Sequence, residues 1–98
     1  MPVTFLIPSY LGSLAGNCTT LFLDSSPKNV HDALAALWHL HPPLRDRIVD
    51  EQGAVRQHIN VFVGDECIRF TGGLDTPVPE NVEISIVPAV SGGIYSLE

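Results

Sequence analysis

The chain alternates between short apolar runs of the strand type and one longer helical repeat. Residues 3–7 and 19–23 are rich in β-branched and aromatic side chains, and Pro8 ends the first run. We therefore expect two strands that pair as a hairpin. The segment Ser9–Asn17 holds two glycines and several polar residues, so it is predicted to be a connecting turn or loop.

The middle of the chain carries the only long helical pattern. The residues with the spacing of one helical face are Val30, Leu34, Leu37, Trp38 and His41. Ser26 is predicted to be the N-cap, with Pro27 at the first helical position, because both residue types favour these places. Pro42-Pro43 then ends the helix near residue 41, since a residue before proline avoids helical geometry.

The second half of the chain predicts three more strands. Residues 58–63 alternate, Gly64-Asp65 supplies a turn, and residues 67–70 resume extended structure, which together indicates a hairpin. Residues 82–87 form the last strand, and residues 44–48 are expected to form a short helical turn. The strand positions predicted to face inward are Ile59, Val61, Val63, Val82, Ile84 and Ile86.

The predicted order is therefore two strands, one main helix and three strands. A sheet and a helix that are each apolar on one side pack together, so we expect a two-layer α+β domain of the β-grasp type. At 98 residues the chain has room for one such domain but hardly for a deep enzyme pocket as well. We expect the domain to span residues 1–90, with residues 91–98 as a flexible C-terminal tail.

The charge balance is acidic, with 5 Lys and Arg against 11 Asp and Glu and a net charge of −6. The basic residues form no run, so the positive patch that nucleic acid requires is missing. An acidic surface suits docking on a basic patch of a partner protein. No apolar stretch reaches the roughly 18 residues of a membrane span, and the N-terminus lacks a basic n-region with a cleavage site. We therefore expect a cytoplasmic protein without nucleic acid or membrane partners.

The residues that commonly carry chemistry form no recognisable set. Cys18 and Cys67 make no CxxC pair and are expected to be reduced thiols. The four histidines share no metal-ligand pattern, so no metal site is expected. No Ser/His/Asp or Cys/His arrangement can be assigned, which argues against a small enzyme.

Three segments of the last third carry a family resemblance. Asn60–Glu66, Ile68–Leu74 and Val87–Gly93 resemble the ThiS/MoaD sulfur-carrier family, in particular the CysO-type carrier of cysteine biosynthesis. The likeness extends to the first strand and so covers most of the chain. It implies a ubiquitin-like β-grasp fold, with a mixed sheet of about five strands packed on one main helix. A Gly-Gly pair alone marks an ordinary loop, but Gly92-Gly93 behind a last strand and Pro88-Ala89-Val90 is a strong signal.

The resemblance implies that Gly92-Gly93 is the working part of a protein co-substrate, not of an enzyme. An E1-like adenylating enzyme would use ATP to activate the Gly93 carboxylate, and sulfur would then replace AMP. The resulting thiocarboxylate would deliver sulfur inside a sulfur-accepting synthase, and the chain itself would bind no cofactor. Glycine suits such a tail because the absence of Cβ lets the backbone approach closely. Cysteine synthesis fits best, and siderophore, thiamin or molybdopterin synthesis are the alternatives.

The resemblance also implies a hydrophobic sheet face that docks partner enzymes. The candidate docking residues are Phe62, Arg69, Phe70, Pro88 and Val90. Phe62 is expected to point away from the inward side of its strand, and partner contact and ordinary exposure stay equally open. Arg69 is interpreted first as a solvated strand residue, with contact to an acidic group of a partner as the alternative. Gly72-Gly73 is interpreted as a turn or bulge beside that strand, with a role in docking as the alternative.

The chain departs from the family pattern at its end, where Ile94–Glu98 follow the second glycine. An amide-linked Gly93 carboxyl cannot be adenylated, and three explanations are open. A JAB1/MPN-type metalloprotease cuts between Gly93 and Ile94, or Leu97-Glu98 is a cloning remnant that leaves a shorter extension. In the third, carrier chemistry is lost and the chain is a ubiquitin-like interaction module that is never activated. We favour processing, because Gly92-Gly93 is intact.

Overall fold

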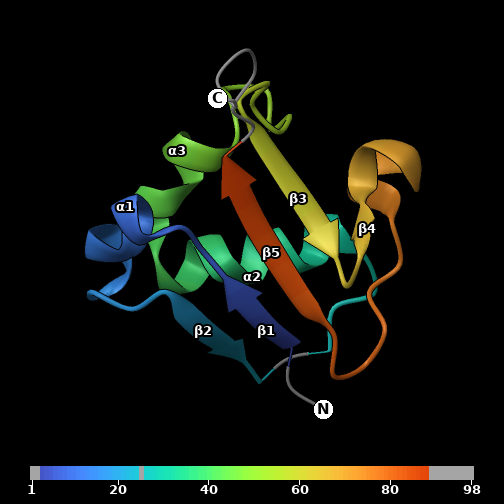
Figure 1. Ribbon diagram of the computed structural model, residues 1–98, viewed down its shortest axis with the longest axis horizontal. Helices are drawn as coiled ribbons and strands as arrows, with labels where there is room; N and C mark the ends of the chain where they lie inside the picture. The colour runs from blue at the N-terminus through green and yellow to red at the C-terminus, as the bar shows by residue number, and fades with distance from the viewer. Residues whose placement is uncertain (1–2, 25, 89–98) are drawn as a thin grey trace.

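The computed structural model describes residues 3–24 and 26–88, in which five strands form one sheet with a helix across one face (Figure 1). The strands are β1 (Val3–Leu6), β2 (Thr20–Leu23), β3 (Ile59–Val63), β4 (Glu66–Cys67) and β5 (Glu83–Pro88). The helices are α1 (Ser9–Gly12), α2 (Val30–Leu40) and α3 (Arg45–Ile48), and 3-10 turns cover Ser13–Ala15, Pro42–Leu44, Ile68–Phe70 and Gly73–Asp75. The predicted order of two strands, a main helix and three strands is confirmed.

The sheet is mixed, with the strand order β2-β1-β5-β3-β4. β1 runs antiparallel to β2 and parallel to β5, while β3 runs antiparallel to both β5 and β4. β2 and β3 therefore run the same way on either side of the central pair, and α2 lies in the crossover that joins them. This topology places the last strand in the middle of the sheet.

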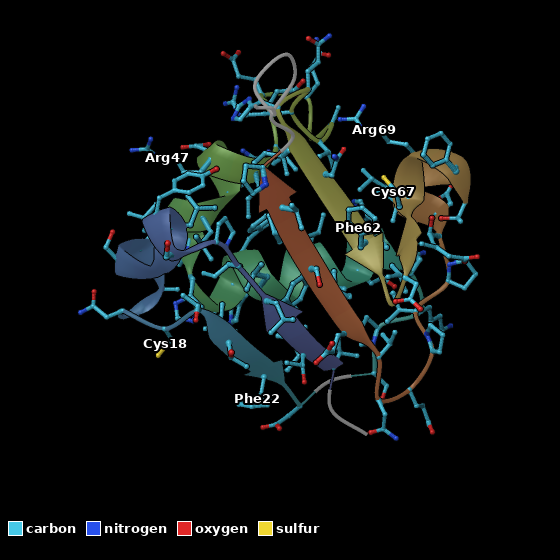
Figure 2. All side chains as sticks on the ribbon, in the orientation of Figure 1. Cys18, Phe22, Arg47, Phe62, Cys67 and Arg69 are labelled. Atoms are coloured by element: carbon cyan, nitrogen blue, oxygen red, sulfur yellow. The ribbon has the colours of Figure 1, made fainter. Side chains whose placement is uncertain are left out.

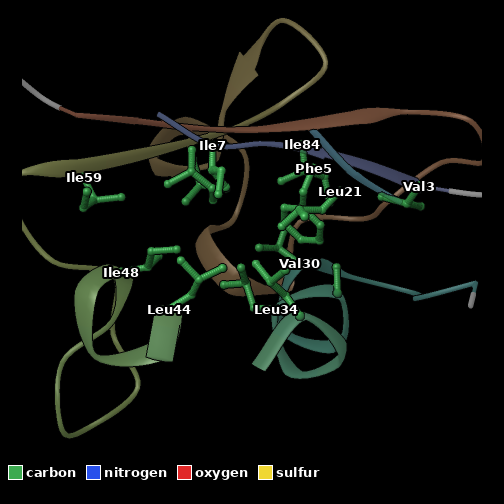
Figure 3. Packing of buried hydrophobic residues seen from close by; sticks show 14 of the residues in the cluster. Val3, Phe5, Ile7, Leu21, Val30, Leu34, Leu44, Ile48, Ile59 and Ile84 are labelled. Carbon is green, nitrogen blue, oxygen red and sulfur yellow. The ribbon is translucent and has the colours of Figure 1, made fainter. Parts of the chain in front are cut away.

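The core lies between the sheet and α2 (Figure 3). Phe5, Ile59 and Ile84 of the sheet are fully buried, and so are Val30 and Leu37 of α2. The segment after α2 adds the buried side chains Leu44 and Ile48. Burying an apolar side chain of this size contributes about 1.5–3 kcal/mol to stability, so the side of the sheet that faces α2 holds the fold together.

The predicted start of the main helix is wrong by one turn. Asn29, not Ser26, is the N-cap, and its side-chain oxygen accepts a 2.8 Å hydrogen bond from the Asp32 N–H. Ahead of the cap, the Val78 N–H donates to the Lys28 carbonyl at 3.1 Å. This bridge holds the chain extended until Asn29, so the helix cannot begin earlier.

The prediction of a plain loop between β1 and β2 is also wrong. α1 and the 3-10 turn Ser13–Ala15 fill this segment. Leu11 and Ala15 are each only 1% exposed. They lie four residues apart, which is the spacing of one helical face. Burial of these two side chains therefore outweighs the polar composition of the segment.

The extended run predicted after the β3 hairpin turn stops early, at Cys67. Ile68–Phe70 instead form a 3-10 turn, because the Ile68 side chain turns into the core and is 4% exposed. Gly72 and Gly73 follow with φ values of 122° and 62°. Glycine adopts positive φ without a Cβ clash, so the prediction of a turn at this pair is confirmed.

Candidate functional site

The outer face of the sheet, opposite α2, is the candidate docking surface. Alternate strand residues form this face, namely Thr4, Leu6, Thr20, Phe22, Asn60, Phe62, Glu83, Ser85 and Val87. In the register, Leu6 lies opposite Ser85 and Ser85 lies opposite Phe62, so one row of side chains crosses the sheet. Phe62 is half-buried on this face (Figure 2), whereas its strand neighbours Val61 and Val63 are buried on the other. The predicted orientation of Phe62 is confirmed.

Sequence reasoning missed two exposed hydrophobic residues of the outer face. Phe22 is 66% exposed and Val87 is 38% exposed. Phe22 lies between the buried Leu21 and Leu23, so strand alternation alone indicates its direction. Val87 follows the buried Ile86 in the same way. The alternation of strand residues could have identified both, but each lies in a continuous run of apolar residues, in which the outward positions do not stand out.

Arg69 ties the 3-10 turn after β4 to the start of β3. Its Nε donates to Asn60 Oδ1 at 2.8 Å, and its Nη2 donates to the carbonyls of Ile59 and Gln57 at 3.0 and 3.2 Å. Arg69 is exposed, as the interpretation of a solvated residue expects, but it lies in a 3-10 turn and not in a strand, and it binds three acceptors. Anchored in this way, the turn holds the adjacent Phe70, which is 87% exposed, at a fixed place on the surface.

Pro88 ends β5 and lies opposite Ile59. The Ile59 N–H donates to the Arg56 carbonyl at 3.0 Å, and its own carbonyl accepts from Arg69 at 3.0 Å. Neither group faces β5, so a proline without an N–H removes no sheet hydrogen bond there. Strand alternation puts Pro88 on the same side as the buried Ile86, where it is exposed at the end of the strand. The predicted docking residues thus do not all share one face.

The chemistry predicted for the tail falls outside the described residues. Val90, Gly92, Gly93 and Ile94 are not among residues 3–24 and 26–88, so their roles stay predictions. β5 runs between β1 and β3, and its last residue, Pro88, comes five positions before Gly93. Five fully extended residues span at most about 17 Å. The number of intervening residues therefore limits how far Gly93 can be from the end of β5.

The remaining reactive side chains lie apart. Cys18 is exposed and Cys67 is half-buried, and both are free thiols. Within the described ranges, no three His, Cys, Asp or Glu side chains are grouped so that they could hold a metal ion. Across residues 3–24 and 26–88, every helix is too short or too polar to cross a membrane.

Known proteins resemble this chain in sequence and in structure. The model of the ThiS family matches residues 6–93. Sulfur carrier protein CysO of Mycobacterium tuberculosis is 30% identical over 95 residues, which cover 95% of this chain and 100% of that protein. Small archaeal modifier protein 1 of Haloferax volcanii is 32% identical over 83 residues, or 85% of this chain and 91% of that protein.

Among solved structures, a chain in the crystal structure of the Amycolatopsis orientalis BexX/CysO complex matches with a TM-score of 0.81. The two chains are 32% identical, and the match covers 93% of this chain and 99% of that one. The fold predicted from the sequence is therefore confirmed as a ubiquitin-like β-grasp. With a family match over most of its length, this chain belongs to the ThiS family of sulfur carriers and ubiquitin-like modifiers.

Proposed function

We propose that this chain is a sulfur carrier whose C-terminus, once cut after Gly93, is adenylated and converted to a thiocarboxylate. The observation that carries the proposal is where the family match ends. It runs from residue 6 to residue 93 and leaves Ile94–Glu98 outside. The part of the chain shared with the family thus stops at the residue whose carboxyl would react.

The chemistry requires a free carboxylate on Gly93. One carboxylate oxygen attacks the α-phosphorus of ATP, pyrophosphate leaves, and a mixed anhydride with AMP forms. A sulfur nucleophile then displaces AMP and leaves the thiocarboxylate. In the uncut chain the Gly93 carbonyl is bonded to the nitrogen of Ile94, and an amide offers no anionic oxygen for the first step. The cut between Gly93 and Ile94 therefore precedes activation, and a JAB1/MPN-type metalloprotease is the proposed agent.

In this proposal the folded body supplies position and the partners supply the catalytic groups. An E1-like activating enzyme contacts the outer face near Phe62 and the exposed Phe70. Its active site receives the tail, whose reach is limited by the short distance from Pro88 to Gly93. The CysO of Amycolatopsis orientalis has been solved in complex with BexX, which supports docking of a whole carrier on a partner protein.

The sulfur acceptor is a biosynthetic synthase, and cysteine synthesis is the proposed pathway. The full-length similarity to a sulfur carrier named CysO supports this choice over siderophore, thiamin or molybdopterin synthesis. ATP is bound by the activating enzyme and not by this chain. The proposal locates the cycle in the cytoplasm, where ATP is abundant and the thiols of Cys18 and Cys67 stay reduced.

Intact mass spectrometry tests the proposal directly. The full chain and a chain that ends at Gly93 are each incubated with ATP, a sulfide source and the activating enzyme. We expect the mass of the shorter chain to rise by the exchange of one oxygen for sulfur, and the mass of the full chain to stay unchanged. Adding the protease should then convert the full chain to the shorter, modified species.

Two outcomes contradict parts of the proposal. A full chain that gains sulfur without trimming would disprove the required cut. A chain ending at Gly93 that never forms an adenylate or a thiocarboxylate would disprove carrier chemistry and favour the non-activated interaction module. A chain ending at Gly92 is the matched control, because it also ends in a free glycine carboxylate but lacks Gly93.

A further inference from the structure

A groove lies at the side of the sheet, between the edge strand β2 and the helix α2, and one of its lining residues, Phe22, also belongs to the outer face. It has a volume of about 370 Å³ and is lined by Phe22, Leu23, Asp24, Ala36, His39 and Leu40. Among the described residues, five large hydrophobic side chains are exposed, and two of them line this groove. Phe22 is 66% exposed and Leu40 is 54% exposed, so apolar area on both walls is open to solvent.

Among residues 3–24 and 26–88, β2 is the last strand of the sheet and pairs with β1 alone, so the backbone along its other side has no strand partner there (Figure 1). The Ile7 N–H donates to the Thr19 carbonyl at 2.9 Å, so residue 19 faces β1. Strand alternation then directs the backbone groups of Leu21 and Leu23 toward β1 as well. The N–H and C=O groups of Thr20 and Phe22 consequently point outward along the groove.

β2 lacks the usual protection of an edge strand. Natural sheets block their edges with charged residues, prolines, bulges or very short strands. Residues 20–23 contain no charge and no proline, and their register with β1 runs without a bulge. The opposite edge shows the contrast, because β4 is two residues long and carries Glu66. The β2 edge thus offers unpaired backbone groups of Thr20 and Phe22, and the groove beside it is largely apolar.

We propose that an extended segment of a partner protein pairs with β2 as an additional strand and fills this groove. Its backbone bonds Thr20 and Phe22, and alternate side chains reach opposite sides of the sheet. Side chains on the helix side contact Ala36 and Leu40, and those on the other side contact Phe22. The residues that line the groove include none of those assigned to sulfur transfer, so the inference does not depend on that proposal.

Charge selects the kind of partner. Asp24 lines the groove, and the chain carries a net charge of −6. A segment with alternating apolar residues and flanking lysines or arginines therefore complements the site. The same net charge opposes pairing with a second copy of this chain, because two acidic molecules repel each other.

The test uses the full chain and a synthetic peptide in which isoleucine alternates with threonine and lysines flank both ends. We expect amide chemical shifts and slowed hydrogen exchange at Thr20 and Phe22 on binding. Leu40→Lys should weaken binding about tenfold or more, because it places a charge on the apolar wall. Tyr10→Lys is the matched control, since Tyr10 is 57% exposed outside the groove, and it should bind as the unmodified chain does.

A charge exchange keeps the test independent of folding. Asp24→Lys should weaken the lysine-flanked peptide and favour a glutamate-flanked version of it. The proposal is overturned if the peptide leaves the amides of Thr20 and Phe22 unchanged, or if Leu40→Lys and Tyr10→Lys bind it equally. It is also overturned if sedimentation without peptide shows a dimer that Leu40→Lys dissociates, because the occupant would then be a second copy.

Discussion

The two faces of the sheet come from alternate residues of the same strands, and they differ in burial and in what they contact. On the inner face Ile59, Ile84 and Ile86 are at most 3% exposed and pack against α2. On the outer face, between or beside them, Ser85 is half-buried and Val87 is exposed. The comparison teaches that one side of each strand maintains the fold, while the other is left free for contacts with partners.

The largest effect is expected from truncation on the inner face. Ile84→Ala should lower the free energy of unfolding by about 2–5 kcal/mol, because it leaves a cavity in a close-packed core. Its neighbour on the outer face is the control, and Ser85→Ala should change stability by about 0.5 kcal/mol or less. Urea titrations of both variants measure the difference, and equal losses would contradict the division between the faces.

A smaller loss of stability is expected when Arg69, which links the 3-10 turn after β4 to the start of β3, is replaced. Arg69→Ala should lower stability by about 1–2 kcal/mol, because three acceptors on and before β3 lose their donor. Arg69→Lys keeps the charge without the forked donor geometry and should recover less than half of that loss. Urea titration measures both, and a lysine variant as stable as the parent would show that charge alone matters.

The next prediction concerns the N-cap of α2, the helix that covers the inner face. Asn29→Ala should lower stability by about 1 kcal/mol, because the Asp32 N–H loses its acceptor. Ser26→Ala should have almost no effect, since Ser26 is exposed and lies ahead of the cap. Thermal unfolding followed by circular dichroism compares the two. A larger loss of stability for Ser26→Ala than for Asn29→Ala would show that Ser26 is the N-cap, as expected from the sequence.

The smallest effect on stability is expected at Phe70, which is 87% exposed. Phe70→Ala should change the free energy of unfolding by about 0.5 kcal/mol or less. If it contacts the activating enzyme, as proposed, kcat/KM for adenylation of a chain ending at Gly93 should fall about tenfold. Tyr10→Ala in the same truncated chain is the control. Equal kcat/KM values for the two variants would show that Phe70 is not part of the docking surface.

The fold was predictable where the signal is local. Strand alternation identified residues 59–63 and the inward side of β5, and the helical spacing identified α2. The failures have nonlocal causes. The cap at Asn29 depends on the contact between Lys28 and Val78, which are 50 residues apart in the sequence. No pattern within one segment encodes such a contact.

The candidate site divides in the same way. Alternation predicted the direction of Phe62, and the motif around Gly92-Gly93 predicted the family to which the chain belongs. The anchoring of Arg69 escaped prediction because its acceptors are an amide side chain and two carbonyls, 9 to 12 residues earlier in the chain. Backbone carbonyls are present in every residue, so composition gives no sign of which of them an arginine will reach.

The parallel pairing of β1 with β5 has a mechanical consequence. These two strands are neighbours and carry the first and last described residues, so their arrows in Figure 1 point the same way. A pulling force applied to the two ends would load the hydrogen bonds between them in shear, all at once, instead of opening them one after another. We expect a high rupture force in single-molecule stretching. An enzyme that draws the C-terminal residues into its active site could therefore pull on the carrier without unfolding the sheet.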